Sequence, residues 1–174
     1  MSEVKNKKKK SSIIQVSIGV LAVILALLII IMMGIVSDIQ GTARIVNYTG
    51  LVRGETQRII KLEVAGEQDD AMIQEVRSFI GGLRDGNTKL NLVYLNDKDF
   101  QNKMQELDEG FSDLYKAICL GRSEGYEKTD IISRSEDFFV ICDEATGLAE
   151  KYSQKKATSL SLLEKYITAD IVVL

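Results

Sequence analysis

Residues Asn47 to Lys61 read NYTGLVRGETQRIIK, and this stretch predicts how the chain is organised. It lacks proline, and its apolar residues recur every three to four positions, as on one face of an α-helix. With its neighbours, the stretch gives a predicted core stripe of Ile45, Tyr48, Val52, Ile59 and Leu62. Glu55 falls in this stripe, where a carboxylate is costly unless paired. We therefore expect either an ion pair at Glu55 or a stripe that is wider and more accessible to water.

The opposite side of the predicted helix is polar and contains two glycines. Each glycine in a helix interior costs about 1 kcal/mol relative to alanine. Gly50 and Gly54 have the small-xxx-small spacing that lets two helix backbones approach closely. We therefore expect this face to meet another helix and to bring cationic and amide groups to the contact. Its members are Asn47, Gly50, Gly54, Gln57, Arg58 and Lys61, with Arg53 at the edge.

The spacing Asn47-x-x-Gly50-x-x-Arg53-x-x-x-Gln57-Arg58 resembles the signature helix of bacterial transmembrane sensors. That family includes nitrate/nitrite sensor kinases and the chemoreceptor-like transducers of type IV pili. The wider stretch from Arg44 to Glu63 resembles sensor regions that precede diguanylate cyclase or histidine kinase modules. Thr49 and Gly54 depart from the family, which usually carries alanine and methionine there.

The resemblance implies a four-helix-bundle ectodomain that dimerises through its first helix. It also implies that Arg53 binds a small anion, with a ligand-binding set of Asn47, Gly50, Arg53, Gly54, Gln57 and Arg58. Two guanidinium groups at a helix contact can chelate an anion through parallel hydrogen bonds. The alternative is that Arg53 and Arg58 are solvated and paired with Glu55, Glu63 or other acids.

The start of the chain predicts a membrane anchor. Residues 1–12 hold five lysines, Lys5 and Lys7 to Lys10, and are expected to form an unfolded cytoplasmic tail. Residues 13–36 are almost wholly apolar and long enough, at 1.5 Å per residue, to cross a bilayer. A cleaved signal peptide is the alternative, but its apolar core is about 7–15 residues long and ends in small residues. We expect an uncleaved span.

Residues 37–168 are expected to form an extracellular, antiparallel four-helix bundle. The first helix continues from the span, a turn follows Gly66, and the second runs from about Asp70 to Leu83. Residues 89–95 are interpreted as a loop over the bundle, and Asn96-Asp97 as a helix cap. The third helix has a near-heptad seam of Phe100, Met104, Leu107, Phe111, Leu114 and Ile118. After a connection over 121–129, the fourth begins near Ser133. Its predicted stripe is Phe138, Cys142, Ala145, Ala149, Tyr152, Leu160, Leu163 and Ile167.

The C-terminal residues 169–174 end in the apolar run Ile171 to Leu174 and are expected to begin a second span of a longer receptor. Cys119 and Cys142 flank the predicted third connection, so they form either a disulfide or two buried free thiols. With two cysteines and no histidine in the chain, we expect no metal site and no cofactor. No nucleophile–base pair or phosphate-binding loop is recognisable, so we expect no catalysis by this segment.

Two functional hypotheses remain from the sequence. The first is the ligand-sensing module of a transmembrane signalling receptor, which acts as a homodimer in the bilayer and binds a small anion. The second is a membrane-anchored helical structural or interaction protein without a small ligand. Neither involves nucleic acid, because the lysine run directly precedes the apolar segment and is explained by membrane orientation.

Overall fold

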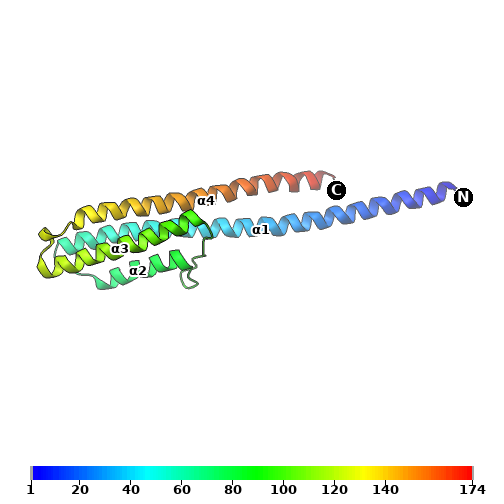
Figure 1. Ribbon diagram of the computed structural model, residues 1–174. Coiled ribbons are helices and arrows are strands. Elements are labelled where there is room, and N and C mark those ends of the chain that lie inside the picture. Colours follow the sequence, from blue (N-terminus) through cyan, green and yellow to red (C-terminus); the bar gives the residue numbers. More distant parts are fainter. Residues whose placement is uncertain (1, 174) are drawn as a thin grey trace. The chain divides into compact units, whose positions relative to one another are not determined.

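A computed structural model describes residues 2–173, and the side chains of residues 13–173. The described chain is all-α, as predicted. Its elements are α1 (Ser2–Val64), α2 (Asp70–Asp85), α3 (Lys98–Glu124), the short 3-10 turn η1 (Tyr126–Lys128) and α4 (Ile131–Val173) (Figure 1). Within residues 2–173 no strand forms, and the β-type pairing is a single isolated bridge between Asn87 and Leu92.

The chain divides into two compact units, and α1 and α4 contribute to both. One unit is Gln40–Gln154, which contains α2, α3 and η1 complete. The other consists of α1 up to Ile39 and α4 from Lys155 onward. The predicted ectodomain, residues 37–168, extends beyond the first unit at both ends.

Aspartates fix the starts of the two central helices. The side chain of Asp69 accepts a hydrogen bond from the backbone N–H of Met72 at 2.9 Å, and that of Asp97 from Phe100 at 3.1 Å. Each bond satisfies a backbone N–H that has no partner inside the first turn of a helix. The predicted turn after Gly66 and the predicted cap before the third helix are therefore confirmed.

The core of the Gln40–Gln154 unit is built from all four helices, whose parts lie side by side in Figure 1. All six predicted seam residues of α3 are buried, as are Ile73, Val76, Ile80 and Leu83 on α2. The first half of the predicted α4 stripe, Phe138 to Ala149, is buried too, whereas its second half is only half-buried: Tyr152, Leu160, Leu163 and Ile167. Burying a large apolar side chain stabilises the fold by about 1.5–3 kcal/mol, so these repeats hold the unit together.

The buried stripe of α1 differs from the predicted one. It follows an alternating three–four spacing through Thr42, Ile45, Thr49, Val52, Thr56, Ile59 and Glu63, and Ile60 is buried beside it. Tyr48 and Leu62 pack only at its edge. The prediction that Glu55 lies in the core is wrong: its side chain is 29% exposed, and Glu63, 1% exposed, is the carboxylate in the stripe. Threonine fits this stripe because its methyl group packs in the core, and the Thr49 hydroxyl donates locally to the Val46 carbonyl.

The segments that connect the helices pack against the core. Leu92 and Leu95 are buried, which confirms the interpretation of residues 89–95 as a loop over the helices. A Cβ on Gly82 would lie 3.0 Å from the Leu92 side chain, so glycine there admits the loop. The predicted connection over 121–129 begins too early, because α3 continues to Glu124 and Gly121 is buried under the ring of Tyr126.

The other unit holds the apolar run. A window of 18 residues in α1 has a mean hydropathy of 3.2 and none of it is buried, so α1 is long and apolar enough to cross a membrane. The prediction of an unfolded tail is wrong, because α1 begins at Ser2. No proline or glycine interrupts residues 2–18, so a helix nucleated in the apolar run propagates back through them. In the predicted second span, residues 171–173 are exposed and helical, and Leu174 lies outside the described residues.

Candidate functional site

The polar face of α1 that the sequence singled out is partly open to solvent. Asn47, Gly54, Arg58 and Lys61 are exposed, and Gly50 is half-buried. A Cβ added at Gly50 or Gly54 would meet nothing within 4 Å. The packing of the described chain therefore does not explain why glycine stands at these two positions.

Arg53 turns toward α4 and is not free. Its guanidinium forms an ion pair with Asp143 and lies 5.0 Å from the centre of the Phe139 ring, in a cation–π arrangement. Both partners of the ion pair are well exposed, at 39% and 52% of their side chains. Such solvent-exposed pairs contribute about 0–1 kcal/mol, so this ion pair adds little to the stability of the fold.

Gln57 also bonds to α4, and Arg58 does not. The Gln57 side-chain amide donates a hydrogen bond to the backbone carbonyl of Ser135 at 3.2 Å. Arg58 faces solvent and has only a long contact of 3.8 Å with Glu55. The structure thus brings Arg53 and Gln57 together along the α1–α4 seam, and leaves Arg58 outside it.

Asn47 lies at the other end of this face, beside a shallow pocket. The pocket has a volume of about 460 Å³ and is lined by Gln40, Ala43, Arg44, Asn47 and Tyr48. The pocket contains a second arginine, Arg44. Arg44 and Arg53 are nine residues apart on α1, which places them on opposite sides of the helix, so their guanidiniums do not share this pocket.

The α4 side of the seam presents a third open glycine. The hydroxyl groups of Thr146 and Thr49 lie 2.9 Å apart, which sets the two helices in register. Gly147 and Gly50 each follow one of these threonines, and a Cβ on Gly147 would also meet nothing within 4 Å. The surface formed by Gly50, Gly54 and Gly147, here called the glycine face, is therefore continuous over α1 and α4.

A buried ionic cluster at the end of the core was not found from the sequence. Glu63 accepts a 2.9 Å hydrogen bond from Arg122 Nε and another from the Tyr126 hydroxyl. Arg122 also donates to Asp70 at 2.8 Å. The cluster joins α1, α2, α3 and η1. The sequence signal was the spacing of four residues from Ile59 to Glu63, which continues the core stripe of α1 to this carboxylate.

The electrostatics of this cluster indicate a structural role. The hydrogen bond to Glu63 is the main reason that the pKa of Arg122 is raised. Burial, followed by the bond to Glu63, raises the pKa of Tyr126 to about 12. With both pKa values raised, Arg122 is charged and Tyr126 is neutral near neutral pH.

The two cysteines are free, so the tentative disulfide is not formed. Cys142 is fully buried in the core, whereas Cys119 is exposed on α3. The expectation of two buried thiols holds only for Cys142. A disulfide requires Cβ atoms that face each other, and a residue in the core and one on the surface do not satisfy this. Within the described residues, no group of three or more metal-ligating side chains gathers.

Comparison of the chain with protein-family models, with curated proteins and with solved structures gives no match.

Proposed function

We propose that this chain is the ligand-sensing part of a bacterial transmembrane signalling receptor. Residues 13–36 anchor it, the lysine tail is cytoplasmic, and residues 37–168 form an antiparallel four-helix bundle outside the cell. One observation carries the proposal: α1 is a single helix that holds both the apolar run and the polar face with its unexplained glycines. Such a helix converts a change in packing at the face into movement of the span.

The contacts between α1 and α4 support an antiparallel arrangement. Thr49 contacts Thr146, Arg53 contacts Asp143, and Gln57 contacts Ser135. The partner's number on α4 falls as the number on α1 rises, as it does for two helices of opposite direction. Connections of a few residues on either side of η1, and between α1 and α2, agree with antiparallel neighbours.

The glycine face supports a symmetric homodimer. Each of its glycines lowers helix stability by up to about 1 kcal/mol without an internal packing benefit, which a close helix–helix contact in a dimer would offset. A two-fold contact places the same surface of each copy against the other. It would bring the exposed Arg58 and Lys61 of both copies near the contact, and a bound anion would offset their repulsion.

Arg53 is the residue proposed to hold the anion. In this structure Asp143 supplies the negative charge, which makes that carboxylate an internal competitor for the ligand. A planar anion would replace it with two parallel hydrogen bonds to the guanidinium. Asn47 and Gln57 would add neutral polar groups on either side. The proposed site needs no cofactor and performs no chemistry on the ligand.

The test is thermal unfolding and sedimentation of the full chain in nanodiscs with nitrate, acetate and phosphate. We expect one of these anions to raise the melting temperature and to favour the dimer. At a hundredfold excess over its dissociation constant, the ligand would add about 2.7 kcal/mol. Arg53→Ala should abolish the response. Asp143→Asn should strengthen it, because the competing charge is gone and the shape is kept.

Lys116→Ala is the matched control, since it removes an exposed cation from α3, away from the α1–α4 seam. It should leave the response unchanged. If Arg53→Ala responds to the anion as the unchanged chain does, the proposed site is wrong. Gly54→Leu tests the dimer independently of the ligand, because its larger side chain should block close approach of the two copies whichever anion is present.

A second function, a membrane-anchored structural or interaction protein, is favoured by the internal partners of Arg53 and Gln57. Under this alternative those side chains only join α1 to α4. It predicts that no anion in the panel changes the melting temperature, and that Arg53→Ala and Asp143→Asn lower stability by similar small amounts.

A further inference from the structure

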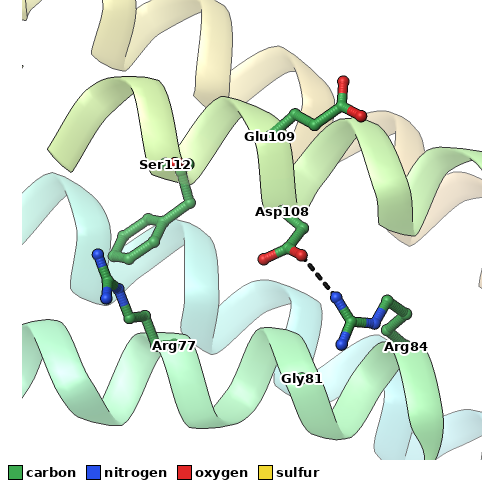
Figure 2. A pocket seen from close by; sticks show the side chains of 7 residues that line it. Arg77, Gly81, Arg84, Asp108, Glu109 and Ser112 are labelled. Carbon is green, nitrogen blue, oxygen red and sulfur yellow. Dashed lines mark hydrogen bonds and ion pairs between the residues drawn. The ribbon is translucent and has the colours of Figure 1, made fainter. Parts of the chain in front are cut away.

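A groove between α2 and α3 has the features of a second binding site. Its volume is about 520 Å³, and Figure 2 shows its labelled residues on two facing helices. The lining residues are Arg77, Gly81 and Arg84 from α2, and Asp108, Glu109, Phe111 and Ser112 from α3. None of these belongs to the α1–α4 face, so the inference does not depend on the function proposed above.

The groove carries excess negative charge at one end and positive charge at the other. At one end, Arg84 is held by Asp108 at 2.5 Å and by Asp85 at 2.8 Å. Arg84 therefore meets two carboxylates, and one negative charge remains at this end. Glu109 also lines the groove, but its carboxylate points away from Arg84 in Figure 2 and accepts a 2.9 Å hydrogen bond from Gln105.

The other end carries a cation that has no acidic partner. Arg77 lies with its guanidinium 4.3 Å from the centre of the Tyr115 ring and forms no ion pair within the described part of the chain. In Figure 2, Arg77 and Ser112 lie at one end of the groove, and Arg84 and Asp108 lie at the other. A ring holds a guanidinium in place but leaves its N–H groups available to an anion.

Between the two ends, α2 has a glycine that its own packing does not need. A Cβ on Gly81 would meet nothing within 4 Å, whereas one on the neighbouring Gly82 would press on Leu92. The missing side chain keeps the groove open between Arg77 and Arg84. The buried ring of Phe111 adds apolar surface to the lining.

We propose that this groove binds a small zwitterion of the α-amino acid class. The ligand carboxylate pairs with Arg77 and accepts a hydrogen bond from the Ser112 hydroxyl, and its ammonium group meets Asp108. Ser112 and Asp108 are one turn apart on α3, about 6 Å along the axis, which an amino acid spans with a hydrogen bond at each end. A simple anion would be repelled by the excess negative charge of Asp108 and Asp85, and a simple cation by Arg77.

The experiment is isothermal titration of the full chain in nanodiscs with L-serine, L-aspartate and L-leucine, and with acetate and methylammonium as half-ligands. We expect at least one amino acid to bind saturably, and each half-ligand to bind at least about tenfold more weakly, a difference of about 1.4 kcal/mol. If no amino acid binds, or if acetate binds as tightly as the best amino acid, the proposal is overturned.

Two pairs of variants locate the binding. Arg77→Ala should weaken it at least about tenfold, whereas Arg134→Ala, which removes an exposed arginine on α4, should not. Gly81→Leu should fill the groove and abolish binding, whereas Gly81→Ala should keep it. Both glycine variants should fold, because the added Cβ meets open space. Unchanged binding in Gly81→Leu would place the ligand elsewhere. Arg53→Ala should leave this binding intact, which separates the groove from the α1 site.

Discussion

Thr56 and Thr49 occupy equivalent places in the α1 stripe but differ in their hydrogen bonds. The Thr49 hydroxyl donates to the carbonyl of Val46 at 2.9 Å and meets Thr146. The Thr56 hydroxyl is buried and has no partner among the described residues. A buried polar group without a partner costs about 1–3 kcal/mol, so the two threonines should respond differently to the same substitution.

We expect Thr56→Val to raise the free energy of unfolding by about 1 kcal/mol, because the unsatisfied hydroxyl is replaced by a methyl group. Thr49→Val is the matched control and should lower it by about the same amount, since it breaks the bond to Thr146. Denaturant unfolding of the full chain in detergent micelles measures both. A Thr56→Val chain that is no more stable than Thr49→Val would show that the Thr56 hydroxyl is satisfied.

At the scale of elements, the Glu63–Arg122–Tyr126 cluster fixes the end of the core, where α1, α2, α3 and η1 meet. Removing one partner of a buried ion pair leaves an uncompensated charge and costs about 3–5 kcal/mol. The cluster depends on Gly121, because a Cβ there would lie 2.2 Å from the Tyr126 ring. The ring must therefore pack directly on the α3 backbone to place its hydroxyl on Glu63.

Gly121→Ala should destabilise the chain by about 1–3 kcal/mol, because the new methyl group displaces the Tyr126 ring. In a Tyr126→Ala background the same change should be neutral or stabilising, since alanine is the better helix former. The double-mutant cycle, read by thermal unfolding, gives the coupling between the two positions. Equal effects of Gly121→Ala in both backgrounds would contradict the proposed contact.

At the scale of the whole molecule, the proposed topology places the lysine tail inside the cell and the helical region outside. Lys116 is a suitable reporter, because its side chain is 74% exposed and only pairs with the exposed Asp113. On a background of Cys119→Ser and Cys142→Ala, Lys116→Cys should react with a membrane-impermeant maleimide on intact cells. Ser11→Cys, in the tail, is the control and should react only after permeabilisation. The reverse pattern would invert the topology.

The sequence by itself determined the helices and most of their buried faces. Apolar spacing, aspartate caps and glycine-containing turns placed α2, the seam of α3 and the first half of the α4 stripe correctly, because these signals depend on residues within one or two turns of each other. The sequence also marked α1 as the helix with an unusual polar face. It did not give the end of α3, because Gly121 serves close packing there and not a turn.

Only the tertiary structure decided what the polar residues do. Arg53 meets Asp143 ninety positions later, and Glu63 meets Arg122 fifty-nine positions later, so no local pattern reveals either pair. Threonine is compatible with core and surface alike, which hid the true phase of the α1 stripe and led to Glu55 in place of Glu63. The pairing of charges and the burial of each thiol depend on how separate helices are rotated against each other. Helical periodicity sets which residues share a face, but not which face of another helix they meet.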